Sequence, residues 1–530
     1  EATVTAKYER KFNSENAAVV DQEHLGGVIG QCEGSIVDCT NRGTVDQASD
    51  PRTVNAGGIC GFVRNAAESL SGNANEGEVR IGGAVTLATV GGVYGSFGKA
   101  QTVADAATTN RGGVTVSGIE SIEGAYLRLG GIVGFAYPGT VLSNLTNAGD
   151  MTVDLQSKFS YYAVGGIAGS VECGASSCVN EGSLRLNNNQ LLTKGMCKIF
   201  VGGIVGINYR PTDDGPHIYE DCANRAEIGF ATTDNAFKVL PSFTGGILGY
   251  TEHPVEVRNC EGAAYINVNN ANAKENGIFT ATGGIVGAVK GTAALIEKCH
   301  VTADVRHYQY NNTWDDPLSA ANGGGIVGCA LGADEVNRIA ITGCSCSGMV
   351  ESKRSGAAGI VGYARFSDIS DCGFTGGIEG SGPHFAGGIA GTLANSTIAG
   401  CTVKAKNIYG HNASSPSLIG VSGIAAYVVG VSSVSDCKAY ATLIRNSTVL
   451  GTEDASVTPD NLFGMGMIVG IDAGTTTVTN CGVGGSFYLG ASEKPQELIL
   501  TLDADSYAKG IIGSGKTATV GGCYYWNGEE

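Results

Sequence analysis

A Gly-Ile-x-Gly-like unit recurs along the whole chain and constrains its fold more than any other feature. Clear copies begin at Gly27, Gly58, Gly92, Gly131, Gly166, Gly203, Gly246, Gly284, Gly325, Gly359 and Gly388, and weaker copies begin at Gly423, Met467 and Gly510. The mean period is roughly 37 residues, within the range typical of solenoids and propellers. Repeats of this size indicate one repetitive architecture rather than several unrelated domains.

Two further blocks keep a fixed spacing within each period. An aliphatic residue stands three positions before a cysteine, and another aliphatic or aromatic residue stands six positions after it, as in Ile36, Cys39 and Val45. The cysteine column consists of Cys39, Cys178, Cys222, Cys260, Cys299, Cys344, Cys372, Cys401, Cys437, Cys481 and Cys523. Each period therefore contains three short β-prone blocks separated by turn residues.

This pattern predicts an all-β chain folded as a single-stranded, right-handed parallel β-helix (β-solenoid) of about fourteen coils, each with three short strands. No segment keeps the 3.6-residue period of helical repeats. We expect residues 1–24 to form an N-terminal cap or first strand and residues 25–530 one continuous repeat domain. A propeller or sandwich scaffold is the alternative, since a period with three strands also suits blades.

Stacking of coils about 4.8 Å apart gives each column a physical role. The aliphatic column forms a buried ladder, and each cysteine packs as a small buried thiol. Metal ligation or disulfides are the alternatives for the column. For Cys173 and Cys178 we expect a pair of buried thiols, and a local disulfide is the alternative. The recurring Gly marks either a place too tight for a Cβ atom or a backbone with positive φ. Asparagines two residues after the cysteine column stack amide on amide: Asn41, Asn75, Asn110, Asn147, Asn180 and Asn224.

Charge and hydropathy exclude several classes of function. The formal net charge is −17 and the isoelectric point is near 4.9, so we expect no nucleic-acid partner. The most apolar stretch, Leu418 to Val431, is shorter than a membrane span and contains three glycines, so we expect no transmembrane segment. The start at Glu1 suits a mature exported protein or a trimmed fragment.

At these repeats the chain resembles the GLUG-motif repeat proteins, named for a Gly-Leu/Val/Ile-x-Gly core. The resemblance extends from Leu25 to Cys523 and includes the closing Cys523-Tyr524-Tyr525-Trp526. It implies a bacterial, exported protein similar to surface adhesins with β-helical rods. The motif also borders the catalytic part of some IgA-cleaving metallopeptidases, whose His-Glu-x-x-His string is missing from this sequence. The resemblance therefore carries over no catalytic residue, and no metal site is expected.

Two nucleotide-binding motifs are better explained by the repeat. Gly510 to Thr517 fits the Walker A pattern and Gly323 to Gly328 fits GxGxxG, but each contains a Gly-Ile-x-Gly unit. A phosphate loop needs a following helix, whereas the next residues here belong to the usual cysteine block. We expect a repeat strand at both places.

Loops of unequal length between the third block and the next Gly unit hold the candidate binding residues, because solenoids bind on the side that insertions decorate. Aromatic rings and carboxylates that can stack a sugar or hold Ca²⁺ occur together at Tyr308, Tyr310, Trp314, Asp315 and Asp316. A second acidic loop contains Asp213 and Asp214. The alternative for both is a solvated loop whose aromatics pack on the scaffold.

These features predict a non-enzymatic, exported protein at the bacterial cell surface or outside the cell. Its expected role is adhesion or glycan binding, with a host or bacterial surface glycan or protein as partner and no cofactor other than Ca²⁺. The alternative is a carbohydrate-active enzyme, a polysaccharide lyase or glycoside hydrolase on a β-helix. Such an enzyme needs two carboxylates, or a carboxylate with Lys or Arg, that converge on a groove.

Overall fold

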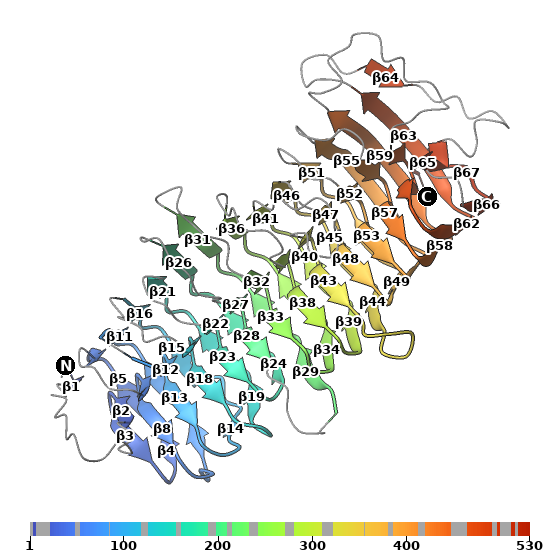
Figure 1. Ribbon diagram of the computed structural model, residues 1–530. Helices are drawn as coiled ribbons and strands as arrows, with labels where there is room; N and C mark the ends of the chain where they lie inside the picture. The colour runs from blue at the N-terminus through green and yellow to red at the C-terminus, as the bar shows by residue number, and fades with distance from the viewer. Residues whose placement is uncertain are drawn as a thin grey trace, which may run out of the picture. The chain divides into compact units, whose positions relative to one another are not determined.

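The computed structural model describes residues 4–6, 22–47, 53–83, 85–117, 126–154, 161–188, 198–208, 215–232, 242–270, 280–309, 322–353, 356–379, 385–411, 419–446, 464–489, 496–498, 510–514 and 518–529. They group into two compact units, Glu1–Val255 with Cys260–Ala273 and Glu256–Asn259 with Lys274–Glu530. Each unit is a parallel β-helix, in which short strands from successive coils pair in parallel sheets (Figure 1). The β-helix prediction is confirmed.

Four parallel sheets run through each unit, here called sheets 1 to 4 in the order in which a coil visits them. In the first unit, sheet 1 contains β2 (Gln22–Gly26), β7 (Thr53–Gly57), β12 (Leu87–Gly91), β17 (Tyr126–Gly130), β22 (Tyr161–Gly165), β27 (Lys198–Gly202) and β32 (Ser242–Gly245). Sheet 2 contains β3 (Ile29–Cys32), β8 (Cys60–Val63), β13 (Tyr94–Phe97), β18 (Val133–Ala136), β23 (Ala168–Val171), β28 (Val205–Asn208) and β33 (Leu248–Thr251).

Sheet 3 of this unit contains β14 (Thr102–Val103), β19 (Val141–Ser143), β24 (Ala175–Ser176) and β29 (His217–Glu220), while β4 (Ile36–Val37) pairs with β9 (Leu70–Ser71) separately. Sheet 4 takes two strands from each coil. The first are β5 (Thr40–Asn41), β10 (Ala74–Asn75), β15 (Thr109–Asn110), β20 (Thr146–Asn147), β25 (Val179–Asn180), β30 (Ala223–Asn224) and β35 (Glu261–Gly262). The second are β6 (Val45–Gln47), β11 (Val79–Ile81), β16 (Val114–Val116), β21 (Met151–Asp154), β26 (Leu184–Asn188), β31 (Ile228–Thr232) and β36 (Ile266–Asn270), and β1 (Val4–Ala6) pairs with β6.

The second unit repeats this order. Its sheet 1 contains β37 (Ala281–Gly283), β42 (Asn322–Gly324), β47 (Gly356–Ala358), β52 (Phe385–Gly387), β56 (Gly420–Ser422) and β60 (Met465–Gly466). Sheet 2 contains β38 (Val286–Lys290), β43 (Val327–Leu331), β48 (Val361–Arg365), β53 (Ala390–Ala394), β57 (Ala425–Val429), β61 (Val469–Asp472) and β65 (Ile512–Ser514). Sheet 3 contains β39 (Ala294–Glu297), β44 (Ile339–Thr342), β49 (Ser367–Ser370), β54 (Thr397–Ala399), β58 (Val431–Ser435), β62 (Thr475–Thr479) and β66 (Thr519–Gly521). The strand β34 (Val255–Arg258) contributes residues to both units.

Sheet 4 of the second unit changes form along the chain. It begins with the short strands β40 (His300–Val301), β45 (Ser345–Cys346), β50 (Gly373–Phe374), β41 (Val305–Gln309), β46 (Val350–Lys353) and β51 (Ile378–Glu379). It continues with the long strands β55 (Thr402–His411), β59 (Lys438–Asn446) and β63 (Gly482–Leu489), followed by β67 (Tyr524–Tyr525). The strand β64 (Gln496–Leu498) pairs antiparallel with β63.

The three predicted blocks all lie in strands, and turns divide two of them. A turn after the Gly pair separates sheet 1 from sheet 2, and a turn just before the cysteine column separates sheet 3 from sheet 4. At the second turn a single residue has positive φ, as at Asp38 (53°), Asp221 (53°) and Asp436 (54°). This left-handed residue redirects the chain, so that two successive residues, such as Ser435 and Asp436, lie outside while Val434 and Cys437 are buried. That is why the aliphatic residue and the cysteine are three positions apart rather than two.

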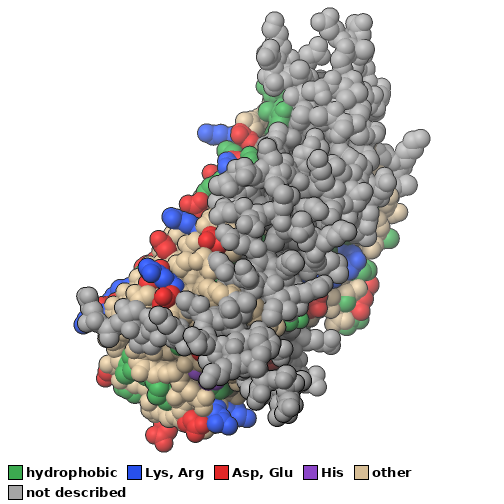
Figure 2. Space-filling model, turned by 60° about the vertical axis from the view of Figure 1, so that its left-hand side comes forward, with side chains coloured by type: hydrophobic (Ala, Val, Ile, Leu, Met, Phe, Trp, Pro, Cys, Tyr) green, Lys and Arg blue, Asp and Glu red, His purple; other side chains and the backbone are tan. Residues whose placement is uncertain are grey.

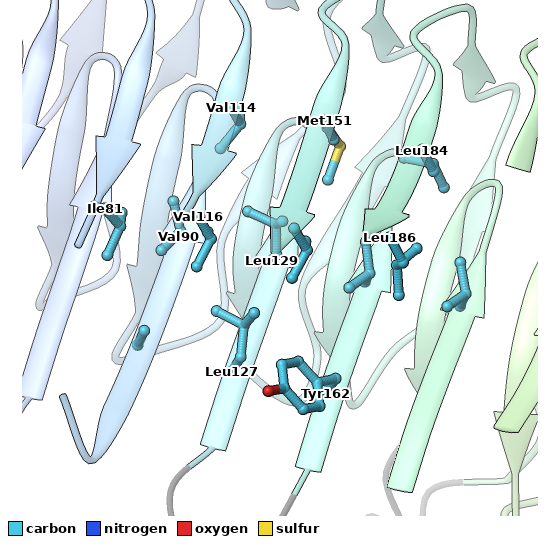
Figure 3. Packing of buried hydrophobic residues seen from close by; sticks show 14 of the residues in the cluster. Ile81, Val90, Val114, Val116, Leu127, Leu129, Met151, Tyr162, Leu184 and Leu186 are labelled. Carbon is cyan, nitrogen blue, oxygen red and sulfur yellow. The ribbon is translucent and has the colours of Figure 1, made fainter. Parts of the chain in front are cut away.

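Side chains of like kind lie over one another inside each unit, as the columns predicted. In the second unit Ile296, Ile341, Ile369 and Ile398 are in register from coil to coil. In the first unit the core lies between sheets 1 and 4, where Leu127 and Leu129 of β17 face Val114 and Val116 of β16 (Figure 3). These side chains are almost fully buried, and each contributes roughly 1.5–3 kcal/mol of gross burial.

The recurring glycines are required because the backbones approach closely at the corner between sheets 1 and 2. A Cβ atom on Gly131 would lie 2.1 Å from the carbonyl oxygen of Gly166 and 2.3 Å from Cγ of Asn147. One on Gly130 would lie 2.0 Å from the carbonyl oxygen of Val133. Neither glycine has positive φ, so of the two explanations predicted for this unit, lack of space for a Cβ atom is confirmed.

The predicted asparagine row forms a continuous hydrogen-bonded ladder in the first unit. Nδ2 of each residue donates to Oδ1 of the asparagine in the next coil at 2.8 Å, from Asn41 through Asn75, Asn110, Asn147 and Asn180 to Asn224. Each Nδ2 also donates to a carbonyl two residues further on, such as Gly112 O for Asn110 at 2.9 Å. The amides are buried, so these bonds satisfy polar groups that water cannot reach. This row is structural.

Candidate functional site

The cysteine column lies inside the scaffold and makes no site. None of the sixteen cysteines that the structure describes forms a disulfide, and all but Cys39 are buried. Cys173 and Cys178 are among them, so the local disulfide is not formed. Each column thiol lies against backbone carbonyls, as Cys222 Sγ donates to Glu220 O and Ala175 O at 3.4 Å each. This agrees with the interpretation of the column as packed thiols. Outside the column, burial raises the pKa of Cys173 to about 12.

Most of the predicted loop site lies outside the described residues. Tyr310, Trp314, Asp315 and Asp316 fall between β41 and β42. Asp213 and Asp214 fall between β28 and β29, at a different corner of the coil, and are likewise outside the described part of the chain. The proposals that these residues bind sugar or Ca²⁺ therefore remain predictions.

Tyr308, the remaining member of that group, packs on the scaffold. Its hydroxyl donates to Glu351 Oε2 at 2.7 Å, and the Arg306 guanidinium lies 5.0 Å from its ring. Arg306 also donates to both carboxylate oxygens of Glu351, at 2.7 and 3.2 Å. Burial alone would raise the pKa of Glu351, but the hydrogen bonds from Arg306 and Tyr308 outweigh it and hold the pKa below its usual value. These contacts join neighbouring strands β41 and β46, so Tyr308 lies in a strand rather than in a loop.

A row of aromatic side chains between sheets 1 and 2 was missed by the sequence analysis. The outer faces of these two sheets turn toward each other beyond the glycine corner. In the first unit the ring of Phe200 lies 5.1 Å from that of Tyr250, and Phe243 lies 4.7 Å from the same tyrosine. All three are buried, so they form a second packed layer rather than an open binding surface. No column predicts this layer, because its members pair in register with residues of other kinds, as Phe200 does with Ala163 and Tyr250 with Ile207.

An open groove on the outer face of sheet 4 is the best candidate site in the second unit. It has a volume of about 420 Å³. Its lining comes from β55, β59 and the segment after β67: Lys404, Ala405, Lys406, Tyr440, Thr442, Asn527, Gly528 and Glu529. Lys404 and Tyr440 occupy the same register position on adjacent strands, so both side chains point out of the sheet at the same level. We call this site the lysine–tyrosine groove.

The wall of the groove is built by the segment that follows β67. Trp526 continues the pairing, since its backbone N–H donates to Val483 O at 2.8 Å, and its ring is buried. The segment crosses the sheet over glycines of β63: a Cβ atom on Gly484 would lie 2.0 Å from Trp526 O. Gly528, with φ of 85°, then lies against the ring of Tyr440. The Trp526 side chain also donates through Nε1 to Glu529 O, which fixes the rim.

Three lysines surround this wall without a carboxylate partner. Lys404 Nζ lies 5.4 Å and Lys438 Nζ 5.7 Å from the centre of the Trp526 ring. Among the described residues neither lysine, nor Lys406, forms an ion pair. Elsewhere on the surface acidic and basic side chains are interspersed in the face that Figure 2 shows. In a chain with a net charge of −17, this cluster of unpaired ammonium groups is a local exception.

The groove also presents an aromatic face and neutral hydrogen-bonding groups. Tyr440 is 40% exposed although it is a large side chain on a sheet. Thr442 lies two residues along the same strand, and the Asn527 amide donates to Glu529 Oε2 at 3.1 Å. An exposed ring beside donors of this kind is the composition of a site for a polar ring-shaped ligand. Two features of the sequence could have indicated this groove: the alternation Lys404-x-Lys406 and the closing Tyr524-Tyr525-Trp526. The resemblance included the closing residues but assigned them no role.

The chain matches no family model, no curated protein and no solved structure. The resemblance to GLUG-motif proteins thus remains a prediction from the repeat itself. Within the described ranges, no three His, Cys, Asp or Glu side chains converge as metal ligands. No helix in that same part of the chain is long and apolar enough to cross a membrane. The Walker-like segment enters β65, which pairs with β61 in sheet 2 and is a repeat strand.

Proposed function

We propose that this protein is an exported, non-enzymatic scaffold at the bacterial cell surface that binds glycans on the outer face of its β-helix. The observation that carries the proposal is the lysine–tyrosine groove. A ring that is 40% exposed stands on a rigid sheet, with lysines and hydroxyl and amide groups around it. Aromatic faces stack on the apolar side of sugar rings, and polar neighbours bind the hydroxyl groups.

The scaffold suits this role because paired strands form one side of the groove. Strands β55 and β59 pair from Thr402 and Lys438 to His411 and Asn446, with one β-bulge between Ala405 and Asn407. A groove on paired strands loses little conformational freedom when a ligand binds. The repeat architecture and the resemblance to exported repeat proteins support the location outside the cell.

The experiment that tests the proposal is a glycan array probed with the purified chain and with Tyr440→Ala. The expected result is binding of a subset of glycans by the wild-type chain and loss of that binding in the variant. Tyr137 is 38% exposed and lies in the first unit, away from the groove residues in sequence, so Tyr137→Ala is the matched control. A chain that binds no glycan, or a Tyr137→Ala variant that loses binding equally, contradicts the proposal.

A second candidate is a polysaccharide lyase, and one observation favours it. The groove brings a carboxylate, Glu529, onto the same surface as Lys404 and Lys406. Proton abstraction beside a uronate carboxylate needs a base and a cation in one groove. Incubation of the chain with polyuronates tests this: the appearance of unsaturated, ultraviolet-absorbing products would favour the lyase over the non-enzymatic scaffold.

A further inference from the structure

The charge of the lysine–tyrosine groove identifies the class of glycan that it suits. Lys404 and Lys406 are both exposed and both line the groove, whereas Glu529 is the one carboxylate in its lining. The lining therefore carries a net positive charge. This inference rests on the function proposed above and narrows it.

The two lysines lie on one strand with their ammonium groups on the same side as the tyrosine ring. Lys404 and Lys406 are both exposed on β55. A β-bulge between Ala405 and Asn407 leaves Lys406 without a register partner on β59, and Lys406 lines the same groove as Lys404. Tyr440 lies beside Lys404 on β59. A sugar ring stacked on Tyr440 thus has ammonium groups along one edge.

The cation–π contact holds Lys404 in place before any ligand arrives. Its Nζ lies 5.4 Å from the Trp526 ring centre, and the ring is 7% exposed. An ammonium beside an aromatic face keeps its charge and its remaining N–H donors available. Because no described carboxylate pairs with it, binding an anion does not require an existing ion pair to break.

We propose that the lysine–tyrosine groove binds an acidic saccharide, a glycan that contains uronic acid. The pyranose ring stacks on Tyr440, and the carboxylate accepts charge-assisted hydrogen bonds from Lys404 and Lys406. Thr442 and Asn527 bind ring hydroxyls. Neutral glycans lack the group that the lysines recognise, so the groove discriminates by charge.

The test uses a trisaccharide of galacturonic acid and its fully methyl-esterified form, which keeps the rings and removes the charge. Isothermal titration calorimetry of the wild-type chain measures the affinity for each trisaccharide. The acidic trisaccharide should bind at least about tenfold more tightly than the ester. Its affinity should fall as salt rises.

Lys404→Met and Lys406→Met combined should lower the affinity for the acid about tenfold and leave the affinity for the ester unchanged. Lys290→Met, which removes an exposed lysine of β38 in the same unit, is the matched control and should change neither. Circular dichroism checks that all variants are folded.

The possible outcomes distinguish a failure of the acidic specificity from a failure of glycan binding itself. Equal binding of acid and ester, with both lost in Tyr440→Ala, overturns the acidic specificity and leaves glycan binding intact. Binding of neither trisaccharide, together with an empty glycan array, overturns both. An effect of Lys290→Met as large as that of the double variant shows attraction by general charge and overturns the assignment of the groove.

Discussion

Asn110 and Asn147 are 37 positions apart in the chain, yet Nδ2 of the first donates to Oδ1 of the second at 2.8 Å. The separation equals one coil, so this bond joins equivalent positions of two successive coils and helps to hold them in register. The same amide continues the row in both directions, because Asn110 Oδ1 accepts from Asn75 Nδ2 at 2.8 Å. A buried row of this kind fixes the register only while every member is satisfied.

Replacing an inner member of the row should therefore cost more than replacing its last one. In Asn110→Val, the buried Nδ2 of Asn75 loses one acceptor and the buried Oδ1 of Asn147 loses one donor. Because both groups stay buried, we expect a loss of about 1–3 kcal/mol in the free energy of unfolding. Asn224→Val removes the partner of Asn180 alone and should cost less. Chemical denaturation of both variants measures the difference; equal losses would contradict the ladder as a cooperative element.

At the corner between sheets 1 and 2, a glycine that contacts a neighbouring backbone should not accept substitution by alanine. Gly131→Ala places a Cβ atom 2.1 Å from the carbonyl oxygen of Gly166. The coils must then separate, so we expect a loss of about 3 kcal/mol or more, or failure to fold. Gly113→Ala is the matched control, because its nearest neighbour would be 3.7 Å away. Thermal denaturation should place Gly113→Ala close to the wild-type chain, and a similar drop in both variants would refute the steric explanation.

His307 should make the second unit sensitive to acid. Its ring is fully buried, Nδ1 lies 2.8 Å from Thr282 Oγ1, and burial lowers its pKa to about 3 from 6.5. Because the folded pKa lies below the unfolded one, the unfolded chain binds the proton first, and the stabilising contribution is complete only above pH 6.5. It is lost progressively as the pH falls toward 3, at about 1.4 kcal/mol per pH unit.

The measurement is the unfolding midpoint of the wild-type chain and of His307→Asn between about pH 7 and pH 4. Asn keeps a group able to bond Thr282 but does not titrate in this range. The variant should therefore show a flatter pH dependence than the wild-type chain. Parallel curves would mean that His307 does not contribute to acid sensitivity.

The column thiols should react with a thiol reagent only when the chain unfolds. Every column thiol except Cys39 is buried, so the reagent cannot reach it while the chain is folded. Cys39 is the described cysteine that is only half-buried and should react first. In a Cys197→Ser background, which removes the cysteine outside the described residues, Cys39→Ser should abolish the fast phase seen with Ellman's reagent. A fast phase that survives would show that the column opens in the native state.

The columns could be predicted from the order of the amino acids. A fixed period with one aliphatic residue, one cysteine and one glycine pair per coil leaves few ways to bury all of them except by stacking, since identical positions must face identical surroundings. Register, the buried thiols and the asparagine row followed from that, because each depends on residues at the same place in every coil.

Contacts between different columns, and features outside the columns, could be recognised only in the tertiary structure. The tight approach at Gly131, the single left-handed residue before each cysteine, and the aromatic layer around Tyr250 depend on how sheets turn toward one another. The groove on sheet 4 joins Lys404 and Glu529, which are far apart in sequence and share no column. Periodicity describes what repeats, whereas this site arises where the segment after β67 crosses over β63 and reaches Tyr440.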